Sequence, residues 1–348
     1  MPDTALNEML SRARALAADD APVLCPHCGG KDLARAGTRK LKAGVRQLYR
    51  CNGCFRRFSN LNRHGKRTPP RAVLDALALA CQSYPYRDIV HALLRKHKVE
   101  VTPGAISKWV KEYQPPYLEI ESMNRRYTPV IRGHLFTHHG LPYHYQVHLP
   151  KLNACPLDGL KSYLLRLPEF IDHSMFEGGE DAPHGGATTT VHEGVVAAPR
   201  AASFTTNRAS QLVIARNEGL KVRDDSPLSK LAAQALQFAP CNRERHPVLE
   251  QYFLACDRST IAVEVPVYFM HNELGSITGH IDVLQFSYGK LWILDYKPEA
   301  KKENAEKVIT QLSLYAMALH YRAKVQLKSI VCAYFDEEAC YEFKPIRL

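Results

Sequence analysis

Side chains suited to phosphodiester hydrolysis gather near the C-terminus of this chain. In order they are Glu264, Gly279-His-Ile-Asp282 and Asp295-Tyr-Lys297. Carboxylates are hard oxygen ligands for a magnesium-class cation, which activates water and neutralises charge on a phosphate. Asp282 and Asp295 are therefore candidate ligands, and Lys297 could orient the water or stabilise developing negative charge.

Three strands are predicted to position these residues. The segments that would form them are rich in β-branched and aromatic side chains and are separated by turn signals, so we expect them to pair as antiparallel strands. Asp295 and Lys297 are two apart in the third strand, so both project from one face. The segments are Val263–Phe269, Ile277–Phe286 and Leu291–Lys297.

A helix is predicted to follow the third strand, over Glu303–Arg322. Gln311 and Tyr315 stand four residues apart in it and therefore share one face. That face could lie over the path of a nucleic acid.

Together these residues resemble the RecB-like branch of the PD-(D/E)XK nucleases, whose pattern is His, G-x-x-D, D-x-K and Q-x-x-x-Y. The similarity runs from about Ser226 to the end and implies a restriction-endonuclease-like mixed sheet flanked by helices. Glu264 could join the metal ligands through water, and Glu250 is a weaker candidate. The metal ligands, the catalytic lysine and the auxiliary pair that the resemblance implies are His246, Asp282 and Asp295, then Lys297, then Gln311 and Tyr315.

A second set of possible ligands lies near the N-terminus. Cys25-Pro-His-Cys28 and Cys51-Asn-Gly-Cys54 are two C-x-x-C pairs separated by 22 residues. This is the spacing of a four-thiolate zinc site, in which no coordination position stays open, so the zinc would be structural. The Thr38–Tyr49 stretch between the pairs is predicted to form a hairpin. The segment is similar to the zinc ribbons of insertion-sequence transposases.

Three helices are predicted after this zinc ribbon. The run that starts at Thr102 resembles the recognition helix of a helix-turn-helix, with Ser107, Lys108 and Lys111 available to a major groove. A plain three-helix packing unit is the alternative. The predicted helices are Arg71–Gln82, Tyr86–His97 and Pro103–Tyr113.

Charge favours DNA as the partner of this N-terminal part. Residues 39–71 contain no Asp or Glu, and the whole chain has a net charge of +11 and a sequence pI near 9.1. Such a balance favours polyanionic partners, although a solvated basic face is the simpler reading. The basic residues that we expect to contact phosphates are Arg46, Arg50, Arg56, Arg57, Arg63, Lys66 and Arg67.

The 348 residues, of which 45% are hydrophobic, are enough for a multidomain α+β or α/β protein. No signal peptide and no run long enough to span a membrane is found, so a cytoplasmic location is expected. Six cysteines outside the zinc pairs are scattered, which makes a disulfide framework an unfavoured reading. The domains that we expect are an N-terminal segment (1–20), the ribbon (21–65), the helix-turn-helix (66–116), an uncharacterised region (117–225) and the nuclease (226–348).

The region from 117 to 225 carries few signals. Tyr143–Leu149 alternates like a strand, Gly159–Ile171 is predicted to be a helix, and Ser203–Arg216 a further strand and helix. Two histidines in the first of these, together with three others nearby, could suggest a second metal, but such residues more often meet solvent or phosphate. They are His134, His138, His139, His144 and His148.

These parts predict a DNA-processing enzyme in which the N-terminal modules hold DNA and the C-terminal domain cuts it with magnesium or manganese. Work on mobile or invading DNA follows from the combination, either in transposition or in defence against phage and plasmids. Protein partners from such a system and a homodimer are also conceivable. Two other readings remain open: a non-catalytic DNA-binding regulator that keeps the nuclease fold as a scaffold, and an N-terminal platform that recruits a protein partner.

Overall fold

The structure is a computed structural model that describes residues 25, 28, 30–41, 44–59, 68–113, 130–138, 141–170, 207–216 and 219–348. The chain divides into two compact units. The described parts of Met1–Val130, Asp224–Thr260 and Phe335–Cys340 form the first unit. The second unit consists of those in Ile131–Arg223, Ile261–Tyr334 and Tyr341–Leu348.

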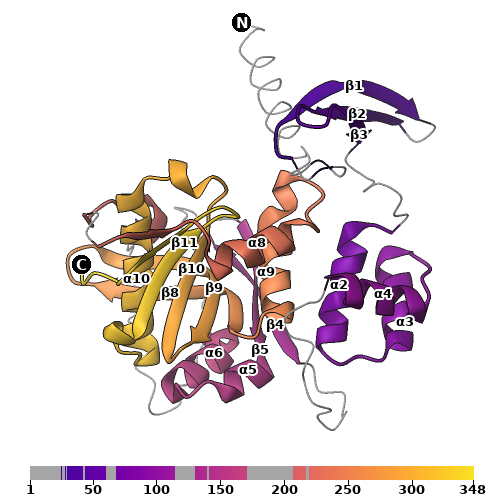
Figure 1. The fold of residues 1–348 in the computed structure, drawn as a ribbon. Helices are drawn as coiled ribbons and strands as arrows, with labels where there is room; N and C mark the ends of the chain where they lie inside the picture. Colours follow the sequence, from indigo (N-terminus) through magenta and orange to yellow (C-terminus); the bar gives the residue numbers. More distant parts are fainter. Residues whose placement is uncertain are drawn as a thin grey trace, which may run out of the picture. The chain divides into compact units, whose positions relative to one another are not determined.

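A nine-stranded sheet organises the second unit (Figure 1). Its strands follow the order β4-β5-β8-β9-β10-β11-β12-β7, and β6 pairs with β9 off this path. The sheet is mixed, because β6 is parallel to β9 whereas β10 is antiparallel to it. The strands are β4 (Ile131–His138), β5 (Leu141–His148), β6 (Asn207–Arg208), β7 (Lys221–Arg223), β8 (Thr260–His271), β9 (Gly275–Ser287), β10 (Lys290–Tyr296), β11 (Ile330–Phe335) and β12 (Cys340–Phe343).

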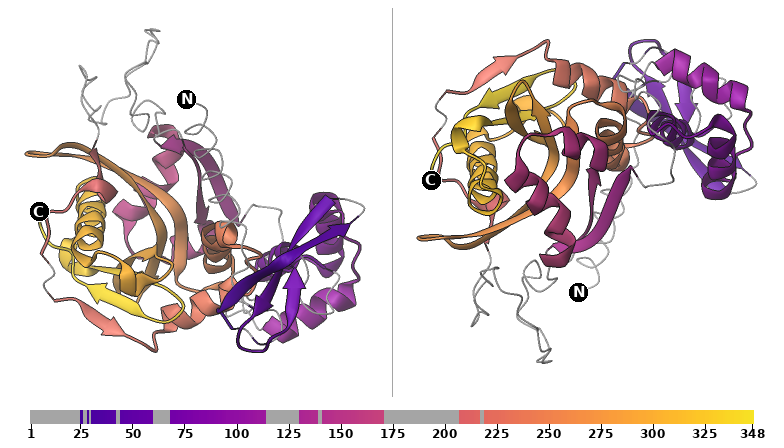
Figure 2. Two further views of the ribbon diagram at one scale, coloured as in Figure 1. Left: turned by 90° about the horizontal axis from the view of Figure 1, so that it is seen from above. Right: turned by 90° about the horizontal axis from the view of Figure 1, so that it is seen from below.

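Helices pack against this sheet, which is visibly curved in the views from above and below (Figure 2). The helix α10 (Ala305–Ala323) contacts β9, β10 and α6 (Asp158–Phe170). Two short elements complete the layer, α5 (Leu149–Ala154) and the 3₁₀ turn η1 (Ala209–Gln211). Most of α10 is buried, so its apolar side chains supply much of the core of the second unit.

Local sequence explains how β9, β10 and α10 begin and end. Tyr288 and Gly289, with φ of 50° and 69°, form the two-residue turn between the strands, and positive φ at both positions matches the right-handed strand twist. Asn304 caps α10, because its Oδ1 accepts the N–H of Lys307 at 3.2 Å. The helix therefore starts two residues after the predicted start at Glu303.

The first unit contains a three-stranded sheet of order β1-β2-β3 and a group of helices. The helices α2, α3 and α4 pack on one another, and α2 also packs on α9. That arrangement buries α2 on most of its circumference. The strands are β1 (Leu33–Leu41), β2 (Gly44–Cys51) and β3 (Arg57–Ser59), and the helices are α2 (Pro70–Cys81), α3 (Tyr86–His97), α4 (Pro103–Tyr113), α8 (Pro227–Leu236) and α9 (Arg245–Cys256).

A buried carboxylate holds three of these helices together. Asp75 on α2 is 7% exposed. It pairs with the Nζ of Lys96 at 2.8 Å, with the ring of His97, and accepts from the side chain of Gln251 on α9. Burial alone would raise the pKa of Asp75, but hydrogen bonds from Lys96, His97 and Gln251 lower it below its ordinary value.

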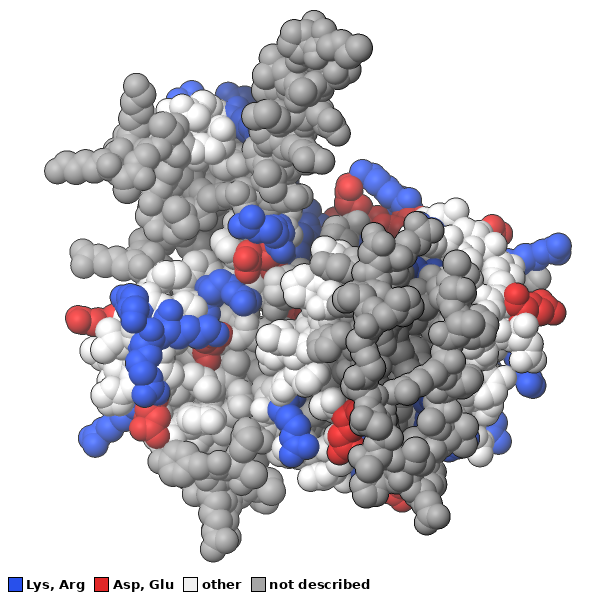
Figure 3. Space-filling model, turned by 180° about the vertical axis from the view of Figure 1, so that it is seen from behind, with Lys and Arg blue, Asp and Glu red and all other residues white. Residues whose placement is uncertain are grey.

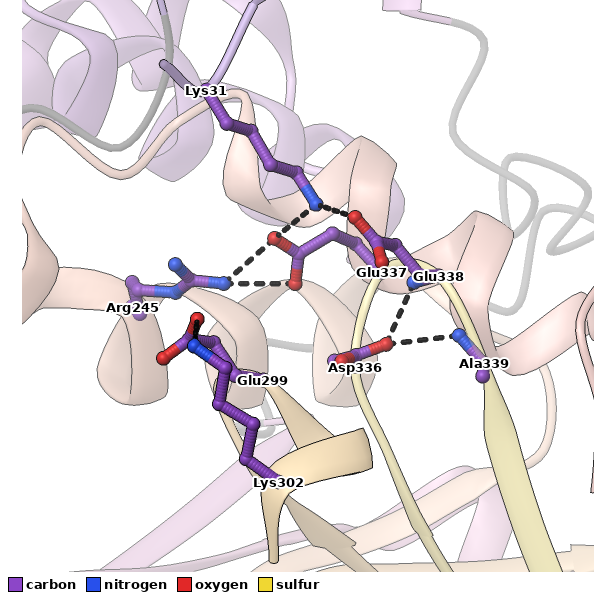
Figure 4. A network of polar contacts seen from close by, with 8 residues as sticks. All are labelled: Lys31, Arg245, Glu299, Lys302, Asp336, Glu337, Glu338 and Ala339. Carbon is purple, nitrogen blue, oxygen red and sulfur yellow. Dashed lines mark hydrogen bonds and ion pairs between the residues drawn. The ribbon is translucent and has the colours of Figure 1, made fainter. Parts of the chain in front are cut away.

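Glu337 organises a second polar network in the first unit (Figure 4). Both of its carboxylate oxygens accept from Nη2 of Arg245 at 2.8 Å, and Lys31 lies 3.1 Å away. Burial raises the pKa of Glu337, but Arg245 and Lys31 outweigh that effect and lower it. Glu337 lies in the turn between β11 and β12. Asp336 shapes this turn, because its Oδ1 accepts the N–H groups of Glu338 and Ala339. The network joins the segment after the first cysteine pair to the first turn of α9.

The structure confirms the three strands and the long helix predicted around the motif residues. It differs at Ser203–Arg216, where the described part contains the two-residue β6 and a 3₁₀ turn instead of a strand and a helix. The sheet also includes β4, β5, β6 and β7, which precede the predicted domain start at residue 226. Within the described residues, no helix is long and apolar enough to span a membrane.

Candidate active site and cysteine centre

Two buried carboxylates face each other across β9 and β10. The strand ladder pairs Leu294 with Val283, and its next step brings Asp295 opposite Asp282. Asp295 is 2% exposed and Asp282 is 8% exposed. The N–H of Tyr296 donates to Oδ2 of Asp282 at 3.1 Å and fixes that carboxylate. Like charges directly opposite one another are unfavourable unless a cation lies between or beside them.

Lys297 supplies one such cation. It follows the end of β10, and its Nζ lies 2.8 Å from Oδ2 of Asp295. Burial acts to lower the pKa of Lys297, but the charges of Asp295 and Asp282 raise it well above its ordinary value. The side chain is therefore held in its charged form. The common face predicted for Asp295 and Lys297 agrees with this contact.

Tyr315 and Gln311 lie on α10, which packs against β9. Nε2 of Gln311 donates to the hydroxyl of Tyr315 at 3.2 Å, a contact that is possible because the two residues share one helix face, and the backbone N–H of His280 donates to the same oxygen. A Cβ built on Gly279 would lie 2.2 Å from a ring carbon of Tyr315, so this site admits only glycine without rearrangement. Tyr315 is 3% exposed and Gln311 is 7% exposed. The pair thus packs on β9 instead of lining an open path for nucleic acid.

Glu264 adds a third carboxylate. Its φ of 49° within β8 lies in the left-handed region, which side chains other than glycine rarely adopt and which clusters at functional sites. Its Oε2 lies 3.6 Å from Nε2 of His280. His280 stands two residues before Asp282 on the same face of β9, so Glu264 contacts the face that carries this buried carboxylate.

Sequence reasoning did not single out His280, Tyr143 or Arg208 as site residues. The rings of Tyr143 and His280 are 4.1 Å apart between centroids, and Arg208 donates a hydrogen bond to Tyr143. The alternating histidine-rich segment was the one available signal, because β6 is too short to leave a pattern. His138, at the end of the preceding strand β4, contacts Thr278 with Nε2 3.2 Å from Oγ1.

His246 and Glu250 lie on α9, in the first unit, whereas the carboxylates lie in the second. His246 occupies the first turn of the helix and both residues are partly buried. Their membership of the metal site stays a prediction.

The four cysteines near the N-terminus form a tight cluster. The Sγ atoms of Cys25 and Cys54 are 3.6 Å apart, and those of Cys28 and Cys51 are 3.5 Å apart. Tetrahedral coordination with Zn–S bonds of about 2.3 Å places sulfurs about 3.8 Å apart. The N–H of Cys54 donates to Cys51 and lowers the pKa of Cys51, whereas hydrogen bonds with the neighbouring thiols raise the pKa of Cys28, as expected when four thiols share one small space. These observations fit a zinc ion.

The carboxylate site fits a hard cation for a different reason. Glu264, Asp282 and Asp295 carry more negative charge than Lys297 neutralises, and two of them are buried. Their oxygens are less tightly grouped than the thiols. Within the described part of the chain, the cysteines are the one set of three or more possible ligands whose donor atoms all lie within 4.8 Å of one another.

The predicted DNA contacts fall on exposed surface where the structure describes them. On α4, Lys108 and Lys111 are exposed and Ser107 is partly buried. Blue side chains gather over the helices α2 to α4 in Figure 3. Arg50, Arg56 and Arg57 are exposed near the cysteines, the side chain of Arg46 is not described, and Arg63, Lys66 and Arg67 lie outside the described residues.

Two acids on adjacent strands of the mixed sheet, with a lysine just after the second strand, form an arrangement that can hold a divalent cation beside a phosphate. The sequence profile of the PD-(D/E)XK nuclease superfamily matches residues 146–345. The match covers more than half of the 348 residues, and the chain belongs to this superfamily. Comparisons with curated proteins and with solved structures gave no match.

Proposed function

We propose that this protein is a DNA-cleaving enzyme of the RecB-like type, in which Asp282 and Asp295 hold Mg²⁺ or Mn²⁺. The observation that carries the proposal is the pair of buried carboxylates opposite each other, with one lysine beside them, in a domain of a nuclease superfamily. Glu264 would act through a bound water. Metal-dependent hydrolysis accounts for buried charge that the fold alone does not require.

When bound, the cation would polarise the phosphodiester and lower the pKa of a coordinated water. Lys297 acts as a permanent positive charge, because its raised pKa keeps the proton on Nζ. It orients the attacking water and stabilises charge that develops on the phosphate. Gln311 and Tyr315 are positioning residues, because they hold the backbone of β9 just before Asp282.

The direct test is cleavage of linear, circular, single-stranded and branched DNA with magnesium or manganese. Lys297→Ala should reduce cleavage by at least about a hundredfold, since one preorganised charge contributes that much to a transition state. The matched control is Lys290→Ala on the same strand, where Nζ meets the carbonyl of Lys328 at the surface. Cleavage that resists EDTA, or that Lys297→Ala leaves unchanged, would contradict the proposal. DNA binding without cleavage under any metal favours the scaffold reading instead.

For the N-terminal part we propose that the cysteines hold a structural zinc and that the helices α2 to α4 bind DNA as a helix-turn-helix. The thiol cluster supports the first statement, and the exposed lysines of α4 support the second. A DNA-binding module of this kind, joined to a nuclease domain, would serve the processing of mobile or invading DNA.

Removing residues 1–114 would be a poor test of DNA binding, because α2 packs on α9 and the Sγ atoms of Cys81 and Cys256 are 3.7 Å apart. Lys108→Ala/Lys111→Ala leaves that packing intact. We expect weaker DNA binding and a log–log salt slope that is smaller by about two. The control is Lys221→Ala/Lys344→Ala, two exposed lysines of the second unit. An unchanged slope for the α4 variant would favour the protein-interaction reading.

A further inference from the structure

A group of polar and aromatic side chains lies beside the carboxylates in the second unit. The strands β4, β5, β6 and β9 contribute one residue each: His138, Tyr143, Arg208 and His280. Tyr143 is the centre of the group, with its ring 4.1 Å from that of His280 and 6.1 Å from that of His138 between centroids. Its hydroxyl accepts a hydrogen bond from Arg208.

Arg208 is half-buried and can be compared with two other cations of the protein. Lys297 and Arg245 each pair with a carboxylate. Within the described residues, Arg208 forms no ion pair, and its buried Nε has no hydrogen-bond acceptor. A guanidinium has five N–H donors, and leaving its buried Nε–H without an acceptor is costly. An arginine with only a structural role would be expected to use a nearby acid.

The strand register places Arg208 in line with the metal site. β6 runs parallel to β9 with Arg208 opposite Thr278, so Arg208 shares a face with Thr278, His280 and Asp282. Asp282 is four residue steps along the strand from Thr278, which is about 13 Å. Burial raises the pKa of Tyr143, Arg208 acts to lower it, and Glu264 and Asp282 raise it further. The charges of Arg208, Glu264 and Asp282 therefore all lie near enough to act on the phenol.

We infer that Arg208 binds a backbone phosphate of the substrate strand close to the phosphate that is cleaved, and that Tyr143 holds the guanidinium in place. The inference rests on the proposed nuclease function and adds a contact for substrate position. Planar guanidinium groups bind phosphate oxygens through two parallel hydrogen bonds, which fixes position as well as affinity. A strand held at Arg208 and at the cation would be set in register along β9.

Binding measured without cleavage tests this contact. Fluorescence anisotropy in Ca²⁺, a hard cation for the same oxygen ligands, would compare wild type, Arg208→Ala and Arg208→Lys. We expect Arg208→Ala to bind about ten- to a hundredfold more weakly, because hydrogen bonds to charged groups contribute that much. Arg208→Lys should recover part of the loss. The matched control is Arg223→Ala, an arginine of the same unit that pairs with Glu342 at the surface.

A set of oligonucleotides, each with one neutral methylphosphonate linkage, identifies the phosphate. In wild type, neutralising the contacted phosphate should weaken binding, and in Arg208→Ala that position should no longer matter while all others keep their effects. Full-affinity binding by Arg208→Ala, or a loss with an unchanged linkage profile, would overturn this inference and leave the nuclease proposal standing. Failure of the wild type to bind any DNA would overturn both.

Discussion

Gly279 and Tyr315 show why two short motifs of this chain occur together. The glycine leaves room on β9 for the tyrosine ring, and the tyrosine hydroxyl takes the N–H of the next residue, His280. Asp282 follows two residues later. Gly279 thus helps to position the segment of β9 that carries a carboxylate of the site.

Gly279→Ala should destabilise the protein by about 1–3 kcal/mol, because the added methyl group forces the Tyr315 ring to shift in a packed core. Urea unfolding measures the loss. The control is Gly104→Ala on α4, where the nearest atom to the new Cβ is the Thr102 hydroxyl at 3.8 Å. If Gly279→Ala combined with Tyr315→Ala is fully additive, the steric explanation is wrong.

Helices of the first unit depend on one another through side chains as well as through apolar packing. Asp75 on α2 receives Lys96 and His97 from α3 and Gln251 from α9. Such a buried carboxylate fixes the relative position of three helices, because each partner has a defined direction. The helices proposed to bind DNA therefore pack, through α2, on α9, which carries the predicted ligand His246.

Asp75→Asn should lower the free energy of unfolding by about 1–3 kcal/mol near neutral pH. The pKa of Asp75 is below its ordinary value in the folded protein, so its contribution is present above the unfolded pKa of about 3.9 and is lost as pH falls through the folded pKa. Unfolding measured at successive acidic pH values should therefore show a smaller difference between wild type and variant. A difference that grows with acid would contradict this assignment.

The elements that carry sequence motifs could be predicted from the sequence, whereas the short strand β6, which carries no motif, could not. Long runs rich in β-branched residues predicted β8 to β10. The predicted start of α10 differs from the observed start by only two residues, because Asn304 caps the helix. Arg208 stands on a two-residue strand whose pairing with β9 depends on tertiary contacts, so no local pattern could reveal it. Tyr143 was seen as part of a strand, but its place beside His280 follows from sheet order, which local sequence does not encode.

At the scale of the whole molecule, the predicted catalytic residues and the predicted DNA-binding lysines lie in different units of the chain. The exposed lysines of α4 lie in the first unit, and the buried acids with Lys297 lie in the second. The net charge of +11 favours a polyanionic partner for the chain as a whole. A nuclease that binds DNA through one module and cuts with another gains affinity without demanding tight contacts around the scissile bond.

The most direct test of this account is the rate of DNA cleavage as a function of Mn²⁺ concentration for wild type and Asp295→Asn. The control is Asp158→Asn, whose side chain is 92% exposed. Loss of a residue that merely supports a metal ligand typically weakens metal binding 10- to 100-fold, so loss of a ligand should cost at least about tenfold. The account predicts saturable, metal-dependent cleavage that Asp295→Asn abolishes or shifts to much higher Mn²⁺. Equal metal dependence in wild type and Asp295→Asn would contradict it.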